Sequence, residues 1–464
     1  MLRNIKTFFS TRSYRPPSGL MPAGIYHYQR QENGGQMRLH LRVEKDGRGL
    51  LLANAARAFH LNPTAAYMAY IYLEGIPEHQ AVASLTRHFH VSKHQAAQDY
   101  ANFITQLSEI THPDGACPVC DLELETLAPF SDRPSAPYRM DLALTYRCNN
   151  DCAHCYNARP RQGTELNTGD WKKILDQLWQ IGIPHIVFTG GEPTLRSDLP
   201  ELVAYAEQLG QITGINTNGR RLKDLDYVSK LVQAGLDHVQ VTLESHDPHI
   251  HDGMVFREGA WEETVAGLRN ALDTKLFIMT NTTLLQENSP YLAQTLEFLA
   301  GLGVPTVGLN ALIYSGNGLT VGKGLPESSL PPLVEMARKL TESYNQRLIW
   351  YTPTQYCHFD PLQLELGVKG CTAALYNMCV EPDGSVIPCQ SFYQTLGYMQ
   401  RDPWESIWNH ELAVSLRTRH NVPDACRDCA LLAECGGGCP LARQVLPAFQ
   451  PQPIHPLEIA HKEG

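Results

Sequence analysis

The sequence predicts an α/β protein: a partial (β/α)6 TIM-type barrel, preceded by a small winged-helix-like domain and followed by a cysteine-rich extension. Three observations support this prediction. From residue 138 to residue 347, strand-like apolar segments alternate with helical patterns. Two strand patterns followed by helical ones come before this region. After it, residues 348–445 show little periodicity but many Cys, Gly and Pro residues, which is typical of a domain held together by metal.

The composition is that of a folded protein, with 43% hydrophobic and 19% charged residues in a chain of 464. No apolar run reaches the ~18 residues that a membrane helix needs, so we expect no membrane partner. The net charge of −10 argues against a general nucleic-acid binder, because phosphate contacts depend on Lys and Arg. The basic residues that precede the first acidic one, Glu32, suit an ordinary tail or a transit peptide.

The N-terminal domain is predicted to span residues 38–113. Pro63 stands at the first position of one predicted helix, and Ser92 can cap another. The strand patterns of this domain are Leu39–Val43 and Gly49–Ala53, and its helical patterns are Pro63–Gly75, His79–His90 and Lys93–Leu107.

Residues 114–137 form a predicted linker that contains Cys117 and Cys120. A C-x-x-C pair suits half of a zinc site, a redox pair or additional ligands of a neighbouring cluster. The sequence leaves these three roles open.

The barrel, residues 138–347, is predicted to contain six β/α units. When parallel strands curl into a barrel, the chemistry lies on the loops that follow the C-terminal ends of the strands. The strand patterns are Met140–Leu144, His185–Phe188, Thr213–Asn216, His238–Leu243, Leu276–Thr280 and Thr306–Leu309. The helical patterns are Gly169–Ile181, Leu199–Leu209, Leu222–Ala234, Ala260–Leu272, Pro290–Leu302 and Leu330–Asn345.

The 13 cysteines occur in bursts, and none precedes Cys117. The bursts lie at 117–120, 148–155, 357–389 and 426–439. An odd number of cysteines in close groups predicts metal ligation in a reducing compartment rather than a disulfide framework. We therefore expect a cytoplasmic protein.

The most informative motif follows the first barrel strand and reads Cys148-Asn-Asn-Asp-Cys152-Ala-His-Cys155. Three thiolates on one loop suit three irons of a four-iron cluster, which leaves one iron free for a substrate or cofactor. The alternatives are a zinc site with His154 as its fourth ligand and a set of unpaired thiols. The position of His154 between two ligands disfavours the tetrahedron that zinc needs.

This spacing, the aromatic Tyr156 that follows it and its place after the first strand resemble the signature of the radical S-adenosylmethionine (SAM) superfamily. At the end of the second strand, Thr189-Gly190-Gly191-Glu192-Pro193-Thr194 is similar to the GGEP motif of that family. The resemblance implies that the glycine backbone and Glu192 hold the amino group of SAM. Glycines allow a close backbone approach, and a carboxylate pairs with an ammonium.

Three further residues are similar in position to SAM-contacting residues of that family. Asn218 lies in a polar turn after the third strand, Thr242 near the end of the fourth, and Arg257 in the loop that follows. Thr242 also suits a strand as a good β-former. Arg257 lies farther from the preceding His-Asp pair than the arginine of the family often does. With Tyr156, Gly190, Gly191, Glu192 and Pro193, these are the predicted cofactor-binding residues, and no catalytic residue is predicted.

The resemblance implies two cofactors: SAM, and a 4Fe–4S cluster held by Cys148, Cys152 and Cys155. The cluster would donate one electron to SAM bound at its open iron, which yields methionine and a 5′-deoxyadenosyl radical. That radical would remove a hydrogen from the substrate. An electron donor of the flavodoxin or ferredoxin type is an expected partner.

The C-terminal cysteines resemble the SPASM extension, the iron–sulfur domain of radical SAM enzymes that act on peptides. Gly384 closes a turn signature between two strands that would bear ligands. Zinc knuckles also use paired cysteines. The matching pattern is Cys371-(12 residues)-Gly384-(4 residues)-Cys389, then Cys426-x2-Cys429-x5-Cys435-x3-Cys439. By analogy with the family, one auxiliary cluster is bound by Cys426, Cys429 and Cys435, and the other by Cys371, Cys389 and Cys439.

The SPASM pattern is incomplete, because no cysteine follows Cys439. The cluster of Cys426, Cys429 and Cys435 would therefore have an open iron or a non-cysteine ligand, or would be absent. Cys357 and Cys379 are both candidates for the fourth position of the other cluster. We favour Cys357, because a ligand upstream of the first hairpin is common in such domains. Either residue can instead be a small buried hydrophobic side chain.

Residues 49–108 resemble PqqD-like domains, the peptide-recognition modules of peptide-modifying radical SAM enzymes. The match runs through Gly49–Asn54, Phe59–Ala66 and Tyr72–Gly75. A DNA-binding helix–turn–helix is the alternative, which the scarcity of Lys and Arg in its helices opposes. In PqqD-like domains the leader of a precursor peptide adds to a sheet edge, and this tether raises the effective concentration of the peptide core.

Together, these resemblances imply a radical SAM enzyme that modifies a ribosomally made precursor peptide, with a thioether or carbon–carbon crosslink as the expected product. Two alternatives stay open: an enzyme that acts on a porphyrin or another cofactor precursor, and a non-enzymatic iron–sulfur electron carrier. The precursor peptide and the electron donor are the expected partners, and we expect no nucleic acid.

Overall fold

The computed structural model describes residues 21–32, 35–54, 57–110, 134–157, 164–420 and 422–445. The predicted pair Cys117 and Cys120 lies outside these ranges. The chain divides into two compact units, and each is described by itself. Among the helices of the described ranges, none combines the length and the apolar character that crossing a membrane requires.

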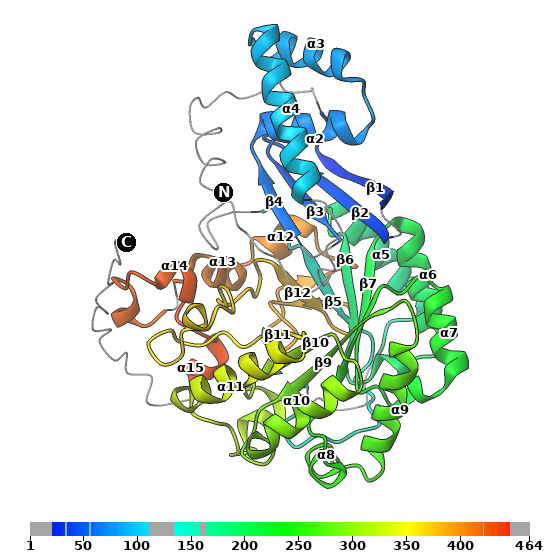
Figure 1. The fold of residues 1–464 in the computed structure, drawn as a ribbon, viewed down its shortest axis with the longest axis vertical. Coiled ribbons are helices and arrows are strands. Elements are labelled where there is room, and N and C mark those ends of the chain that lie inside the picture. Colours follow the sequence, from blue (N-terminus) through cyan, green and yellow to red (C-terminus); the bar gives the residue numbers. More distant parts are fainter. Residues whose placement is uncertain are drawn as a thin grey trace. The chain divides into compact units, whose positions relative to one another are not determined.

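The N-terminal unit contains a four-stranded antiparallel sheet in the order β1-β2-β3-β4 (Figure 1). Its strands are β1 (Gly24–Glu32), β2 (Gly35–Val43), β3 (Gly49–Ala53) and β4 (Arg57–Leu61). The sequence predicted β3 and most of β2. It did not predict β1 and β4, because polar residues interrupt their apolar patterns and pairing with β2 and β3 stabilises them.

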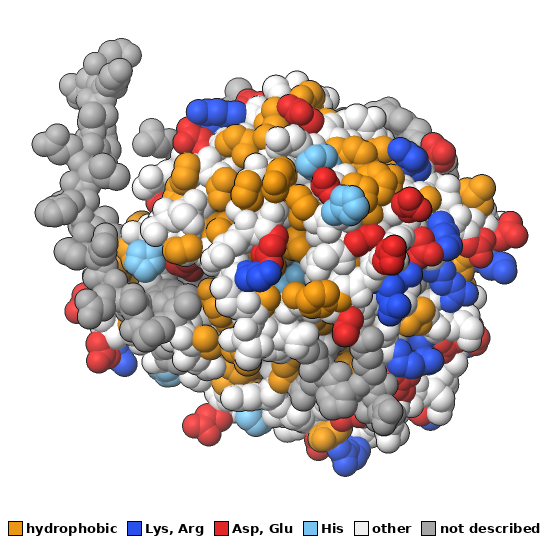
Figure 2. Space-filling view, turned by 90° about the horizontal axis from the view of Figure 1, so that it is seen from below, with side chains coloured by type: hydrophobic (Ala, Val, Ile, Leu, Met, Phe, Trp, Pro, Cys, Tyr) orange, Lys and Arg blue, Asp and Glu red, His pale blue; other side chains and the backbone are white. Residues whose placement is uncertain are grey.

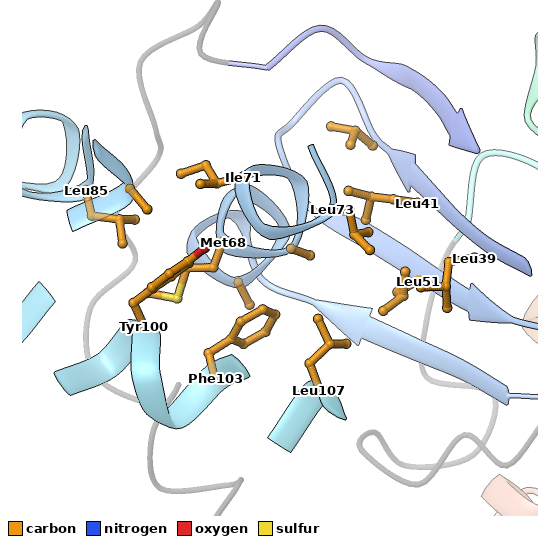
Figure 3. Close-up of a cluster of buried hydrophobic side chains, with 14 of the residues drawn as sticks. Leu39, Leu41, Leu51, Met68, Ile71, Leu73, Leu85, Tyr100, Phe103 and Leu107 are labelled. Carbon is orange, nitrogen blue, oxygen red and sulfur yellow. The ribbon is translucent and has the colours of Figure 1, made fainter. Parts of the chain in front are cut away.

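Three helices follow the sheet: α2 (Pro63–Leu73), α3 (Glu78–Phe89) and α4 (Lys93–Ile110). Both predicted helix starts are confirmed. The side chain of Asn62 accepts a hydrogen bond from Ala65 N at 2.9 Å, and Ser92 Oγ accepts one from Gln95 N at 3.2 Å. Between helices and sheet lies a core that Figure 3 shows, and it includes Leu39, Leu41, Leu51, Met68, Ile71, Leu73, Leu85, Tyr100, Phe103 and Leu107.

Three side chains of β2 form a polar row. Arg38 and His40 bind the carbonyl oxygens of Gln211 and Gly210, at 3.1 Å and 2.8 Å, just beyond α6 (Leu199–Leu209). Arg42 donates to the carbonyl of Gly182 at 3.3 Å, just beyond α5 (Thr168–Ile181). The carbonyl groups at a helix C-terminus favour donors and positive charge, so this row suits its position. The residues of these helix ends belong to the N-terminal unit.

A ten-stranded sheet has the order β11-β10-β9-β8-β7-β6-β5-β12-β13-β14. Consecutive strands from β7 to β11 are parallel, as a β/α barrel requires, and the predicted fold class is confirmed. The barrel strands are β5 (Arg139–Ala143), β6 (His185–Thr189), β7 (Ile212–Thr217), β8 (His238–Thr242), β9 (Phe277–Thr283), β10 (Thr306–Asn310) and β11 (Arg347–Trp350). The last of these, only four residues long, is a seventh parallel strand that the sequence did not predict.

Helices lie outside the strands of the barrel (Figure 1). Besides α5 and α6, they are α7 (Leu225–Gln233), α8 (Pro248–Val255), α9 (Ala260–Leu272), α10 (Leu292–Gly301) and α11 (Leu330–Ser343). Each of the six predicted helical patterns overlaps one of them. Short α8 is additional, and it lies in the loop region that follows β8.

The C-terminal extension begins as an antiparallel hairpin that continues the barrel sheet. The predicted turn is confirmed: Gly384 has φ +85°, and its N–H donates to the carbonyl of Glu381 at 2.9 Å. The strands are β12 (Asn377–Val380), β13 (Ser385–Ile387) and β14 (Gly397–Tyr398). The helices that follow are α12 (Trp404–Trp408), α13 (Glu411–Thr418), α14 (Leu432–Cys435) and α15 (Pro440–Val445).

The sequence has 48 acidic and 38 basic residues. On the face shown in Figure 2, basic side chains lie close to acidic ones, and hydrophobic side chains are spread among them. The charge on that face is therefore balanced locally.

Candidate active site

The loop that follows β5 carries Cys148, Cys152 and Cys155, the three predicted cluster ligands. No disulfide joins the cysteines in the part of the chain that the structure describes. Burial raises the pKa of Cys152 well above its ordinary value, and Cys155 and Glu244 raise it further. A bound metal cation lowers the pKa of a thiol, so a metal ion at this site would bind Cys152 as the thiolate.

Two neighbouring loops hold the cysteine loop in place. The N–H groups of Asp151 and Ala153 each donate at 3.0 Å to carbonyl groups at the end of α8. From the loop after β10, Asn317 donates its backbone N–H to Cys155 O at 2.9 Å and its side-chain amide to Cys152 O at 3.2 Å. Loops that follow β5, β8 and β10 therefore meet at the cysteines, as expected for the C-terminal end of a barrel.

His154 occupies the centre of the cysteine loop and is buried. Its Nε2 lies 2.9 Å from Oε1 of Glu244, which follows β8 and is 1% exposed. The other carboxylate oxygen accepts the N–H of Thr283, the last residue of β9, at 2.9 Å. This imidazole therefore faces a carboxylate, which disfavours the alternative of His154 as a zinc ligand.

Gly190 and Gly191 lie against the backbone of the cysteine loop. A Cβ on Gly190 would meet Thr145 O at 2.3 Å, and one on Gly191 would meet Arg147 O at 2.3 Å. Gly191 N donates to Thr145 O at 2.7 Å. Larger residues would push the two loops apart, so these glycines serve the protein itself as well as any ligand.

The Glu192 carboxylate is 1% exposed and is bound by protein donors. Its Oε1 accepts from Thr194 and from the hydroxyl of Thr217 at 2.7 Å, and its Oε2 accepts from Asn218 N at 2.8 Å. Burial raises the pKa of Glu192, and these hydrogen bonds oppose the rise. Glu192 thus joins β6 to β7, and its predicted contact with the SAM ammonium stays a prediction.

Asn149, between the first two cysteines, is contacted by two predicted SAM residues. The side-chain amide of Asn218 donates to Asn149 Oδ1 at 2.6 Å, and Arg257 Nε donates to Asn149 O at 3.1 Å. Arg220 donates to the same carbonyl at 2.6 Å and forms a salt bridge with Glu263 at 2.6 Å. Arg220 was not among the predicted site residues, although its place directly after the Asn-Gly turn of the third strand was a usable signal.

The other predicted SAM residues occupy the same end of the barrel. Pro193 is buried and begins a short helical turn after β6, and Thr242 is the last residue of β8. Tyr156 donates its hydroxyl to the side chain of Gln390, next to Cys389, at 3.0 Å. A second bond, from Tyr393 to Asn157, also measures 3.0 Å. Two tyrosines therefore tie the cysteine loop to the segment after Cys389.

The remaining predicted ligands lie in the C-terminal extension. The ends of the first hairpin, near Cys371 and Cys389, are held together by a 2.8 Å bond from Ala374 N to Pro388 O. Cys379, the alternative candidate, is buried in β12, packs with Ala143 and Ile387, and has its Sγ 3.9 Å from a Glu381 oxygen. Among the described residues, no three His, Cys, Asp or Glu side chains converge at the spacing of a single bound ion.

Two family models match the chain. The radical SAM superfamily model matches residues 142–299, and the iron–sulfur cluster-binding SPASM model matches residues 371–430. The first range contains the cysteine loop and the Gly-Gly-Glu segment. Neither range covers residues 38–113, so the PqqD-like character of the N-terminal domain stays a prediction.

Among curated proteins, Fe-coproporphyrin III synthase of Methanosarcina barkeri is 29% identical over 327 residues, which is 63% of this chain and 81% of that protein. Among solved structures, Streptococcus suis SuiB bound to its precursor peptide SuiA matches with a TM-score of 0.66 and 16% identity, over 90% of this chain and 96% of that one. Native anSMEcpe with bound AdoMet matches with a TM-score of 0.54 and 15% identity, over 67% of this chain and 92% of that one. At these identities the structural matches show a shared fold.

Proposed function

We propose that this chain, a radical SAM superfamily enzyme with an iron–sulfur SPASM domain, modifies a ribosomally made precursor peptide by forming a thioether or carbon–carbon crosslink. The observation that carries the proposal is the N-terminal sheet, which has β1 and β4 as its edge strands. The fold match to SuiB, which was solved with a precursor peptide and covers 90% of this chain, supports the proposal.

The cofactors are SAM and 4Fe–4S clusters. We propose that Cys148, Cys152 and Cys155 hold the SAM-binding cluster. The cluster supplies one electron, and SAM supplies the 5′-deoxyadenosyl radical that abstracts hydrogen from the substrate. The residues proposed to contact SAM are Tyr156, Gly190, Gly191, Glu192, Pro193, Asn218, Thr242 and Arg257.

The contribution of the protein to this chemistry is position. Hydrogen bonds from α8 and from Asn317 hold the cysteine loop, and the His154–Glu244 pair holds its centre. A loop that is fixed before SAM binds spends little free energy on ordering, and its burial excludes water from a reactive radical. The electron that starts the reaction is proposed to come from a flavodoxin or a ferredoxin.

Auxiliary clusters are proposed in the C-terminal extension, where the SPASM model matches. Their proposed ligands are Cys357, Cys371, Cys389, Cys426, Cys429, Cys435 and Cys439. Bound there, such clusters would supply one-electron redox chemistry, and closing a crosslink after hydrogen abstraction requires the removal of one electron.

Peptide recognition by the N-terminal unit would use main-chain hydrogen bonds. An extended segment can add to an edge strand of an antiparallel sheet whatever its side chains are, so one edge can serve as a tether for a leader. A tethered leader then keeps the segment to be modified at high local concentration near the barrel.

A porphyrin precursor is the second candidate substrate, and one observation favours it: the 29% identity with Fe-coproporphyrin III synthase over 327 residues. That match covers 81% of the synthase and 63% of this chain. An enzyme for a porphyrin would not need a peptide tether, so the two candidates differ in what the full-length chain binds.

A direct test compares the two substrates on anaerobically reconstituted full-length enzyme. Peptides selected from a display library on the enzyme are synthesised and incubated with SAM and dithionite, and mass spectrometry follows the loss of two hydrogens per crosslink. Binding of Fe-coproporphyrin III, the product for which the relative is named, is followed in parallel by its absorption band as the test of porphyrin recognition. A modified peptide supports the proposal. Stoichiometric porphyrin binding without any bound or modified peptide overturns it, and Cys152→Ala is the inactive control.

A further inference from the structure

The chain segment that precedes Cys357 runs beside the last group of cysteines. Tyr356 N donates to Cys435 Sγ at 3.4 Å, and that thiol lies 3.7 Å from Thr354 O. A Cβ on Gly438 would meet Gln355 N at 3.1 Å, so the two segments touch along several residues. Cys357 is the next residue after this contact and is partly exposed.

Cys426, Cys429 and Cys435 belong to one compact run of turns. Cys429 N donates to Cys426 O at 3.2 Å, and Cys435 N donates to Leu431 O at 2.9 Å. The contact of residues 354–356 with Cys435 therefore brings Cys357 to this group, although at least 69 residues of sequence separate them.

We propose that Cys357 is the fourth ligand of the auxiliary cluster held by Cys426, Cys429 and Cys435. This assignment moves Cys357 away from the cluster to which sequence reasoning alone attached it. A closed 4Fe–4S cluster takes four thiolates, and Cys357, Cys426, Cys429 and Cys435 supply four. This assignment of Cys357 does not depend on whether the substrate is a peptide or a porphyrin.

The test counts iron in full-length variants that lack the first cluster (Cys148, Cys152 and Cys155 all changed to Ala), so that only auxiliary clusters remain. Adding Cys357→Ala should remove about four irons, or convert one cluster to a three-iron form seen by electron paramagnetic resonance (EPR). When Cys357→Ala is combined with Cys371→Ala and Cys389→Ala, the enzyme should keep no intact auxiliary cluster. When Cys357→Ala is combined with Cys426→Ala and Cys429→Ala, the iron content should not fall below that of the Cys426→Ala, Cys429→Ala variant.

The reverse pattern, in which Cys357→Ala adds to the loss caused by Cys426→Ala and Cys429→Ala, would overturn the assignment. Unchanged iron and EPR spectra in every background would overturn it as well. Cys379→Ala is the matched control and should keep all iron. Cys357→Ser, which preserves side-chain size, is the second variant. Folding is checked by placing each Cys357 substitution in a chain that keeps Cys148, Cys152 and Cys155, and by measuring the effect of SAM on the EPR signal of the first cluster.

Discussion

His154 Nε2 lies 2.9 Å from Glu244 Oε1, and this buried contact joins the centre of the cysteine loop to the end of β8. Burial lowers the pKa of His154, but Glu244 raises it by more, so the net shift of this pKa is upward. Because Glu244 also accepts the N–H of Thr283, one carboxylate holds three segments at the site. A buried charge that loses its partner is costly, which makes this pair a sensitive point.

We expect Glu244→Gln to loosen the cysteine loop. The variant keeps the size of the side chain but removes the charge that faces His154, which should cost about 1–3 kcal/mol. The rate of cluster loss in urea, followed by absorbance under argon, should rise by about tenfold or more. Glu335→Gln is the control, because Glu335 forms an exposed pair with Lys339, and it should leave the rate unchanged. Equal rates in both variants would show that the buried pair does not stabilise the loop.

We expect Gly191→Ala to prevent assembly of the first cluster. Its Cβ would lie 2.3 Å from Arg147 O and 2.6 Å from Tyr146 O, which are backbone atoms that cannot move without displacing the cysteine loop. Anaerobic reconstitution should then bind about four fewer irons. Gly301→Ala is the matched control, since a Cβ there meets nothing within 4 Å. A Gly191→Ala enzyme with full iron and normal SAM cleavage would contradict the structure.

Features that depend on neighbours in sequence were predicted, and features that depend on distant contacts were not. The helix start at Pro63, the cap at Ser92 and the turn at Gly384 were predicted, because each is formed by residues a few positions apart. Strands β1 and β4 were missed, since pairing with another strand rather than an apolar pattern stabilises them.

The same distinction holds for the site. The spacing of Cys148, Cys152 and Cys155 is local and predicts one loop. The contacts of Glu244 with His154, 90 residues away, and of Arg220 with Asn149, 71 residues away, are made only by the folded barrel. No pattern in a single sequence reports contacts between residues so far apart. For the same reason, the sequence alone does not assign Cys357 to one of the two auxiliary clusters.

We expect the stability of β2 to fall as the pH is lowered below about 6.5. Burial lowers the pKa of His40 to about 3, so the folded state stays neutral while the unfolded state, with an ordinary pKa of ~6.5, takes up a proton. The contribution of neutral His40 to the free energy of unfolding is fully present above pH ~6.5 and is lost progressively as the pH falls towards 3. At pH 5.5 the loss should be about 1.4 kcal/mol relative to pH 7.5.

Hydrogen–deuterium exchange of the β2 amides, corrected for intrinsic rates, measures this change. In His40→Gln most of the pH dependence should disappear. Part of the pH dependence should remain, because burial also lowers the pKa of His27. The His27 ring stacks on the His40 ring with 4.9 Å between the ring centroids. A full pH dependence in the variant would mean that another group is responsible.

Arg419 and Arg443 hold the backbone on the two sides of Cys435. Arg419 donates to Ala433 O at 2.6 Å, and Arg443 donates to Gly437 O at 2.8 Å. Burial and Cys439 raise the pKa of Cys371, and both arginines oppose this rise, so their charges act at the auxiliary cluster site. A nearby positive charge stabilises the reduced cluster, which is the more negative form.

We therefore expect Arg443→Gln and Arg419→Gln to lower the reduction potential of the cluster held by Cys371. At a fixed potential the ratio of reduced to oxidised cluster should fall about tenfold, or ~59 mV for one electron, in an anaerobic EPR titration. Arg417→Gln is the matched control: this arginine also binds carbonyl oxygens, of Ala374 at 3.0 Å and Trp408 at 2.6 Å, but burial alone shifts its pKa. Equal shifts in all three variants would mean that loss of packing, rather than loss of charge near the thiolates, changes the potential.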